Sequence, residues 1–311
     1  MAESEYKQAL VTHIDILGFR EMVKESEREP SRISDLRYVL KVLKKQIGTG
    51  MRYSSRIPDG YHPPTPLFRA FNFSDLTVRA TIIEPEDDFL DIFMDELFTL
   101  VNEQCRLACR DDGNSPILLR GGVTLGPIDV HPGLPEEDFL FGPAVVRAYD
   151  LESTAAIFPR IVIDPKVVKK AASMDSTDVR SQILKSTGMF YKQLVSMSED
   201  GVYFVDYLNA CEDYSYSNFF VFGGGGMSFA THKHMIETRL KILKEEGAPE
   251  RTIQKYLWLA NYHNSKVPSL PDPELVPPVF EGEPDDAEIE QRNKLNREAL
   301  LISEELLNLL K

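Results

Sequence analysis

The sequence is short of cysteine, of positive charge and of long apolar runs, and each shortage excludes a class of protein. Three cysteines, Cys105, Cys109 and Cys211, cannot make a disulfide framework. The longest apolar runs fall far short of the roughly 18 residues that a membrane span needs, so no membrane partner is expected. Acidic residues outnumber basic ones, and the formal net charge of −14 argues against a nucleic acid as the main partner.

What is present is typical of a folded protein of the cytoplasm. Hydrophobic residues make up 42% of the chain, enough for a sizeable core, and charged residues make up 27%, enough for a soluble surface. Cys105 and Cys109 lie one helical turn apart and are most simply reduced core residues. The first residues, MAESEYKQAL, are acidic and polar, unlike a signal peptide. We therefore expect a cytoplasmic protein, whose charge still allows a small polyanion as ligand if metal ions screen it.

The pattern of apolar residues predicts the order strand, helix, two strands, helix, strand in the first part of the chain. The predicted elements are a strand at 8–16, a helical stretch to about residue 48 interrupted at Pro30, a hairpin at 67–83 turning near Ser74–Asp75, a helix at 87–110 and a strand at 116–128. Loops are predicted at 48–66 and 129–138. This order is that of a ferredoxin-like α+β core.

The rest of the chain continues this core and then becomes helical. A helix is predicted at 141–155, beginning at Gly142–Pro143, and strands are predicted at 160–164 and 201–208. The tail is predicted to hold helices at 227–246, 250–264 and 284–311, with a Pro-rich linker at 267–284. We therefore expect an α+β domain over residues 1–210 and a helical C-terminal extension over 211–311 that packs on it.

Two carboxylates stand where predicted core strands end. Asp15 closes the apolar run VTHID, and Asp75 lies at the turn of the hairpin. A buried carboxylate is costly unless a cation, a donor or water satisfies it. In a ferredoxin-like sheet the first strand lies beside the hairpin, so the two aspartates can converge on Mg²⁺ or Mn²⁺, with substrate phosphates completing the coordination. The alternative for Asp15 and the nearby Gly18 is an ordinary turn or helix cap.

Several motifs resemble those of the class III nucleotidyl cyclases. DILGF (15–19) is similar to the first metal motif of that family, FSD (73–75) falls where its second metal aspartate lies, and LRGGVTLG (119–126) resembles its following Arg-x-Gly strand. FGPAVVRAYDLES (141–153) and FPRIVID (158–164) resemble more narrowly the pyrimidine cyclases of the bacterial Pycsar antiphage system. The match covers about residues 8–165 and keeps the order of the motifs.

The resemblance implies a class III cyclase core that forms a head-to-tail homodimer, with active sites across the interface. It implies that Asp15, Ile16 and Asp75 hold two Mn²⁺ or Mg²⁺ ions per site. It also implies that Gly18, Phe19 and Arg120 bind the triphosphate of the substrate. From the residues alone, a buried structural cation is slightly favoured for Arg120.

Base recognition is expected on the strand before Asp75. Arg69 lies six residues upstream, where purine cyclases carry a base-reading lysine. Its planar charged fork suits the carbonyl acceptors of uracil or cytosine. Phe71 and Phe73 would narrow the pocket to a single ring. The alternative for Arg69 is a solvated strand residue.

The sequence departs from the purine-specific enzymes after Gly142. The asparagine and the arginine that those enzymes carry four and eight residues later are replaced by Val146 and Asp150. Arg147 is the nearest cation, and we predict that it contacts the triphosphate or the transition state from the second protomer. The alternative for Arg147 is an ion pair on the helix surface.

These differences favour a pyrimidine nucleotide cyclase. Such an enzyme would convert UTP or CTP to pyrophosphate and a 3′,5′-cyclic monophosphate, cUMP before cCMP, as a second messenger in antiphage defence. The alternatives are a purine cyclase, acting on ATP or GTP, and a catalytically dead cyclase-like dimer that senses nucleotides.

Overall fold

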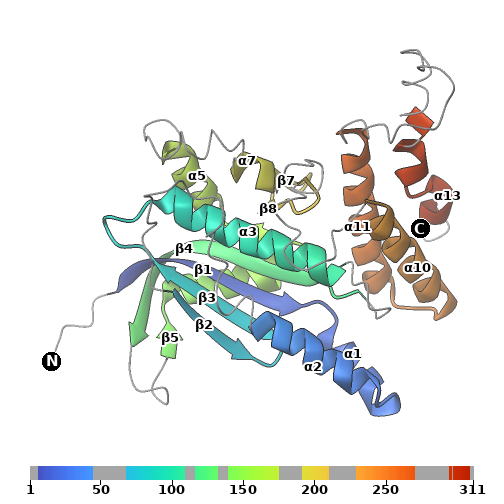
Figure 1. Ribbon diagram of the computed structural model, residues 1–311, viewed down its shortest axis with the longest axis horizontal. Coiled ribbons are helices and arrows are strands. Elements are labelled where there is room, and N and C mark those ends of the chain that lie inside the picture. Colours follow the sequence, from blue (N-terminus) through green and yellow to red (C-terminus); the bar gives the residue numbers. More distant parts are fainter. Residues whose placement is uncertain are drawn as a thin grey trace, which may run out of the picture. The chain divides into compact units, whose positions relative to one another are not determined.

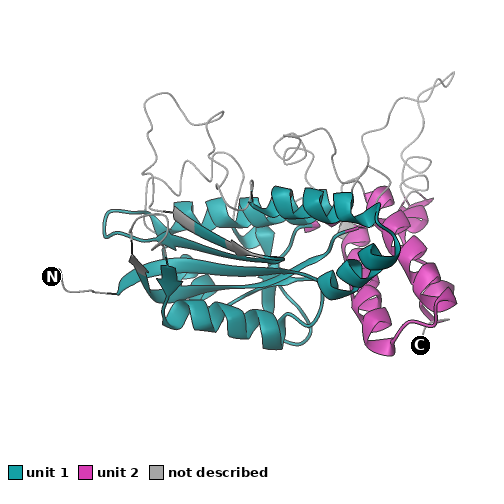
Figure 2. Ribbon diagram, turned by 90° about the horizontal axis from the view of Figure 1, so that it is seen from below, with its two compact units in different colours: residues 1–107, 117–207 teal, residues 108–116, 208–311 magenta. Residues whose placement is uncertain are grey.

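The computed structural model describes residues 6–44, 68–108, 116–131, 139–174, 191–209, 229–269, 294–295 and 297–308. The chain divides into two compact units (Figure 2). The first comprises residues 1–107 and 117–207, and the second comprises residues 108–116 and 208–311. The first unit contains the β-sheet, whereas the described elements of the second are helical (Figure 1).

The long strands form the centre of the sheet. β1 (Lys7–Ile16) lies between β3 (Leu76–Ile82) and β4 (Leu119–His131), and β2 (Phe68–Phe73) is the outer neighbour of β3. Every neighbouring pair in the order β2-β3-β1-β4 is antiparallel. This strand order is the one that a ferredoxin-like core requires. The predicted α+β fold is therefore confirmed.

Shorter strands extend the sheet beyond β4. β6 (Ile161–Ile163) runs parallel to β4, β8 (Tyr203–Val205) pairs with β6, and β7 (Val195–Met197) pairs with β8. β5 (Phe139–Phe141) pairs with the far end of β4. The predicted loop at 129–138 is wrong at 129–131, because pairing with β5 gives these residues strand partners. The apolar pattern does not predict β7.

Helices cover both faces of this sheet (Figure 2). α3 (Phe89–Ala108) lies on one face, where Arg79 of β3 forms a buried ion pair with Glu96, Nη2 to Oε2 2.9 Å. α4 (Pro143–Asp150) lies on the other face, where Ala144 and Ala148 pack against strand residues such as Val11. Residues that alternate along a strand therefore contact different helices.

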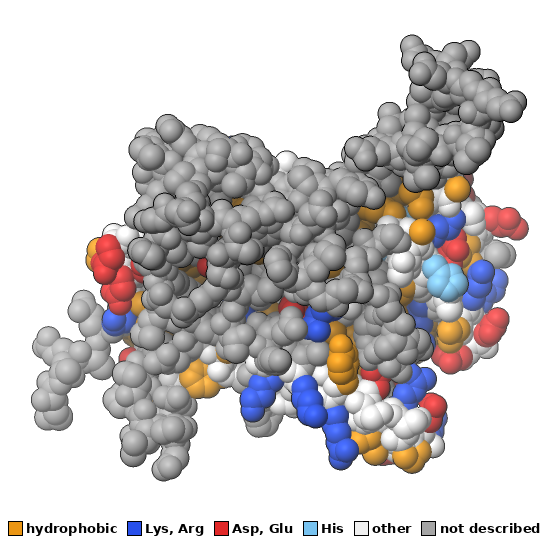
Figure 3. All heavy atoms as spheres, viewed as in Figure 1, with side chains coloured by type: hydrophobic (Ala, Val, Ile, Leu, Met, Phe, Trp, Pro, Cys, Tyr) orange, Lys and Arg blue, Asp and Glu red, His pale blue; other side chains and the backbone are white. Residues whose placement is uncertain are grey.

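α1 (Phe19–Arg28) and α2 (Arg32–Val42) follow β1 and are separated at Pro30, as the sequence predicts. Figure 3 shows Lys and Arg side chains gathered over these two helices, and Arg37 and Lys41 are exposed cations of α2. These helices therefore present basic side chains on the face that Figure 3 shows, although the chain as a whole is acidic. α5 (Pro165–Met174) and α7 (Tyr191–Leu194) are further helices of the first unit.

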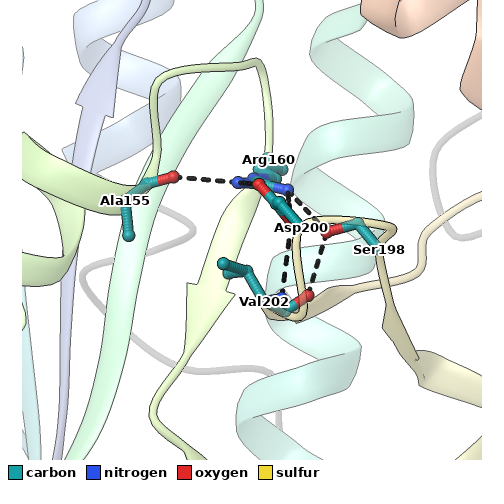
Figure 4. Close-up of polar contacts among 5 residues, drawn as sticks. All are labelled: Ala155, Arg160, Ser198, Asp200 and Val202. Carbon is teal, nitrogen blue, oxygen red and sulfur yellow. Dashed lines mark hydrogen bonds and ion pairs between the residues drawn. The ribbon is translucent and has the colours of Figure 1, made fainter.

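A buried arginine joins β6 to the hairpin of β7 and β8 (Figure 4). Arg160 is 2% exposed, and its guanidinium donates to Ser198 Oγ (2.7 Å), Asp200 Oδ2 (2.6 Å) and the carbonyl of Ala155 (3.1 Å). The hydrogen bond from Arg160 is the main cause that lowers the pKa of Asp200 to about 2. Because this value lies below the ordinary one, the pair stabilises the fold at neutral pH, and that contribution is lost as the pH falls towards about 2.

The second unit contains α10 (Phe229–Glu245), α11 (Glu250–Lys266), a 3₁₀ turn (Val267–Ser269) and α13 (Glu304–Asn308). The prediction of one continuous helix at 284–311 is wrong, because residues 301–303 are not helical. The side chain of Asn264 donates to the carbonyl of Ile302 and accepts its N–H, both at 2.9 Å. These backbone groups are thereby satisfied without helical partners.

The predicted loop at 48–66 and most of the predicted linker at 267–284 lie outside the described residues. Cys109 and Cys211 lie outside them as well, and Cys105 in α3 is a reduced cysteine whose Sγ lies 3.8 Å from the carbonyl oxygen of Tyr207. None of the helices in the described ranges is both long enough and apolar enough to cross a membrane.

Candidate functional site

Asp15 and Asp75 are brought together by the pairing of β1 with β3. Asp15 is the penultimate residue of β1, and Asp75 lies in the turn between β2 and β3, directly after the left-handed Ser74 (φ 57°). A non-glycine residue in that conformation costs about 1–2 kcal/mol. Burial and a hydrogen bond to Asp15 raise the pKa of Asp75, and the charge of Asp15 raises it further. The two carboxyl groups therefore share one small site.

The chemistry of this pair fits a divalent cation. Two neighbouring carboxylates repel each other unless a proton or a cation lies between them. In the parts of the chain that the structure describes, no group of three or more His, Cys, Asp or Glu side chains is placed to hold a metal. A closed structural zinc site is therefore not present among these residues. The pair suits Mg²⁺ or Mn²⁺, which take carboxylates together with carbonyls, waters and phosphate oxygens.

Arg120 is the direct partner of Asp15 across the sheet. The register of β1 and β4 places the two Cα atoms opposite each other. The Nε and Nη2 atoms of Arg120 donate to Oδ2 of Asp15 at 2.8 and 2.6 Å, and Nη2 also lies 2.8 Å from Oε1 of Glu152. The side chain of Arg120 is 28% exposed, so the guanidinium lies at the edge of the core rather than inside it.

The two glycines after Arg120 allow the close packing around this site. A Cβ on Gly121 would lie 2.4 Å from the carbonyl oxygen of His13 in β1. A Cβ on Gly122 would lie 2.4 Å from the carbonyl oxygen of Ala148 and 3.0 Å from the backbone nitrogen of Glu152. Only glycine therefore lets the end of α4 lie directly on β4, and this approach brings Glu152 to Arg120.

Glu152 and His13 are site residues that the sequence analysis missed. Glu152 lies on η2 (Leu151–Ala155), a π-helical turn that continues α4, and is 3% exposed. His13 is 4% exposed, and burial followed by the charge of Arg120 lowers the pKa of His13 to about 4. A sequence signal exists for Glu152, because it follows the buried Ala144 and Ala148 at intervals of four and thus lies on the buried face of a helix.

The first helix, α1, begins shortly after Asp15 in the sequence. Leu17 donates its N–H to the carbonyl of Leu118 (2.8 Å), and Gly18 then takes a left-handed conformation (φ 84°) that begins the helix. Among the described residues, no side chain caps this end of the helix, and Phe19 is its first residue. The first turn therefore offers backbone N–H groups and the positive end of the helix dipole close in the chain to the aspartate pair.

Arg147 forms an ion pair with Asp164 of the same chain. Its Nε donates to Oδ2 of Asp164 at 3.1 Å, and the Oγ1 of Thr124 donates to the same oxygen at 2.9 Å. Burial opposes ionisation of Asp164, but the hydrogen bonds from Arg147, the backbone of Lys166 and Thr124 outweigh it and lower the pKa of Asp164. The side chain of Arg147 is still 48% exposed, so part of it remains open to solvent.

The predicted base-binding residues lie on β2, and only part of this prediction falls on described side chains. The backbone register pairs Arg69 with Ala80 and Phe71 with Val78. Phe71 is half-buried, and Val78 packs against the apolar cluster beneath α4. The side chains of Arg69 and Phe73 lie outside the described part of the chain.

No model of a protein family matches the sequence, and no curated protein matches it. Solved structures of nucleotidyl cyclases are similar in fold. The guanylyl cyclase domain of the RhoGC fusion protein from the aquatic fungus Blastocladiella emersonii is 15% identical, with 64% of this chain and 95% of that chain covered and a TM-score of 0.39. The adenylyl cyclase CyaB from P. aeruginosa is 16% identical, with 65% and 94% covered and a TM-score of 0.36. Similarity of this degree says nothing about the reaction.

Proposed function

We propose that this protein is a nucleotidyl cyclase that converts a pyrimidine nucleoside triphosphate to its 3′,5′-cyclic monophosphate and pyrophosphate. The observation that carries the proposal is the meeting of Asp15 and Asp75 at the ends of neighbouring strands, with Arg120 beside them. The resemblance of the motifs to the Pycsar cyclases supports UTP before CTP, and a second messenger in antiphage defence as the use of the product.

The aspartate pair would hold two Mn²⁺ or Mg²⁺ ions, with the carbonyl of Ile16 as a further ligand at the end of β1. When bound, divalent ions would lower the pKa of the 3′-hydroxyl of the nucleotide and neutralise charge on the departing pyrophosphate. Arg120 would make a bidentate contact with the triphosphate through its guanidinium, together with the backbone of Gly18 and Phe19 at the start of α1. These residues position and neutralise the substrate and form no covalent bond with it.

The proposed reaction balances without any further reactant. A bond forms between the 3′-oxygen and the α-phosphorus, and the bond from this phosphorus to the oxygen bridging to the β-phosphate breaks. The hydroxyl proton passes to solvent, and pyrophosphate carries away the electron pair of the broken bond. The residues of the chain therefore hold the 3′-oxygen and the leaving oxygen in line rather than take part covalently.

We propose that the active protein is a homodimer in which Arg147 serves the site of the other protomer. Exposed apolar side chains flank Arg147 on α4, with Val146 61% and Tyr149 53% exposed. Phe139 and Phe141 of β5 are also exposed. Apolar surface of this kind on a folded protein favours an interface, and a second copy of the chain is the partner that the proposed split site needs.

Mixing two inactive variants tests the split site. In a heterodimer of Asp75→Ala and Arg147→Ala protomers, one site carries both lesions and the other carries neither. A mixture that exchanges subunits should therefore regain up to about a quarter of wild-type activity. If Arg147 acts only on Asp164 of its own protomer, a mixture with proven subunit exchange regains nothing.

The base specificity is tested by supplying UTP, CTP, ATP and GTP with Mn²⁺ and identifying the products. We expect cUMP as the main product of the wild type. In Arg69→Ala, the loss of a polar contact to the base should reduce the preference for UTP by roughly tenfold to a hundredfold. Arg37→Ala on α2 is the matched control and should keep the preference. If only ATP or GTP gives a product, the protein is a purine cyclase and the pyrimidine proposal is wrong. If no triphosphate gives a product, the alternative of a nucleotide-sensing dimer replaces it.

A further inference from the structure

Glu152 is a buried carboxylate that lies against the proposed triphosphate-binding arginine. Its side chain is 5% exposed, and Oε1 lies 2.8 Å from Nη2 of Arg120. The same Nη2 donates to Oδ2 of Asp15 at 2.6 Å. One guanidinium therefore bridges the carboxylate of Asp15 and a second carboxylate deeper in the core.

The position of Glu152 is built into the fold. The contact of Gly122 with Ala148 and with the backbone of Glu152 leaves no room for a Cβ, so η2 is held against β4. Gly122 is two residues from Arg120 on the same strand, and residues two apart share one face of a sheet. Glu152 and Arg120 are thus presented to each other by packed backbone rather than by flexible loops.

A cation at Asp15 changes what holds Arg120. A divalent ion at Asp15 would share the carboxylate with the guanidinium and draw its negative charge away, which would weaken the contacts of Nε and Nη2 with Oδ2. Arg120 then keeps Glu152 as its anionic partner. A long side chain without such an anchor would populate many rotamers, and a triphosphate would have to order it again.

We propose that Glu152 is a positioning residue that holds the guanidinium of Arg120 at the edge of the aspartate site, ready for the phosphate groups of the substrate. This inference rests on the proposed function, because it assigns Arg120 to the triphosphate. Glu152 itself does not touch substrate. A negative charge on Glu152 would repel a triphosphate, so any favourable effect of Glu152 on triphosphate binding has to act through Arg120.

A double-mutant cycle tests this role, because the effect of Glu152→Gln on ligand affinity should depend on whether Arg120 is present. The probe is inorganic tripolyphosphate with Mn²⁺, measured by calorimetry, which needs neither a base nor turnover. Glu152→Gln should weaken tripolyphosphate binding about tenfold, as loss of an orienting partner does. In the Arg120→Ala background, the same substitution should leave binding unchanged or strengthen it, because only the removal of a negative charge remains.

The controls separate this role from a purely structural one. Glu199→Gln removes an exposed carboxylate elsewhere in the same unit and should leave the affinity unchanged. If Glu152→Gln fails to fold, Glu152→Asp keeps the charge, shortens the side chain and should weaken binding in the same direction. Equal weakening by Glu152→Gln in both backgrounds would overturn the positioning role. A wild type that binds no tripolyphosphate with Mn²⁺ would overturn the proposed function as well.

Discussion

Replacing either Asp15 or Asp75 with asparagine should lower the kcat/KM for cyclisation by at least about a thousandfold. Asparagine keeps the size of each side chain and removes the charge that balances the divalent ions. Because the proposed chemistry depends on that charge rather than on a nucleophile, the remaining carboxylate cannot replace the lost one. Turnover of UTP with Mn²⁺, followed as release of pyrophosphate, measures the effect.

The same substitutions should leave the fold intact, which separates a catalytic role from a structural one. The folded-state pKa of Asp75 lies above its ordinary value, so its carboxylate costs stability at neutral pH. Asp75→Asn should therefore raise the melting temperature or leave it unchanged. Glu86→Gln, an exposed change between β3 and α3, is the control that should alter neither activity nor stability. Unfolding of Asp75→Asn, or full activity in either aspartate variant, would contradict the proposed site.

The meeting of Asp15 and Asp75 could be anticipated from the sequence because it follows from strand order. In a ferredoxin-like sheet the hairpin must lie beside the first strand, so a residue at the end of β1 and a residue in the β2–β3 turn share one edge. Periodicity sufficed to find these elements. No contact between individual side chains had to be known in advance.

The contacts of Arg120 with Glu152 and of Arg147 with Asp164 could not be anticipated in this way. Each pair joins residues on different elements, and its formation depends on the angle at which α4 lies on the sheet. Asp164, at the end of β6, meets Arg147 only because the parallel pairing of β6 with β4 brings that strand beneath α4. The interruption of the predicted helix at Ile302 could not be anticipated either, because the backbone of Ile302 bonds to Asn264 of another helix.

A histidine pair in the second unit likewise could not be predicted from the sequence. His232 of α10 and His263 of α11 are both fully buried, with their Nδ1 atoms 3.0 Å apart. Nε2 of His263 lies 2.9 Å from the carbonyl oxygen of Leu300, which can only accept. His263 therefore donates through Nε2 and accepts at Nδ1, and His232 donates through Nδ1. Both rings are neutral in this arrangement.

The surroundings of the pair hold it in the neutral form. Burial is the main cause that lowers the pKa of both histidines, and the pKa of His232 is lowered further by His263. For His263, the charge of Lys233 acts in the same direction, whereas the contact with Leu300 and the charge of Glu237 oppose it. The unfolded chain therefore binds protons in weakly acidic solution that the folded unit does not.

Stability of the second unit should consequently fall on acidification through the histidine pair. Each histidine that titrates only in the unfolded chain, near its ordinary pKa of 6.5, should cost about 2 kcal/mol between about pH 7.5 and about pH 5. The loss begins as the pH falls below about 6.5, because the unfolded state then binds more protons. For the pair, the loss should exceed that of His232 alone, because the pKa of His263 is lowered as well. Urea unfolding followed by fluorescence measures it, because Trp258, the single tryptophan of the chain, lies in α11 of this unit.

The variant His232→Gln isolates this effect from other titrating groups. It should be less stable than the wild type near pH 7.5, because a buried hydrogen bond is altered, yet its deficit should shrink by about 2 kcal/mol on going to about pH 5. His234→Gln is the matched control, two residues away on the same helix and exposed, and its curve should run parallel to that of the wild type. A deficit of His232→Gln that stays constant across this range would show that His232 takes up a proton in the folded unit, and the neutral pair would then be wrong.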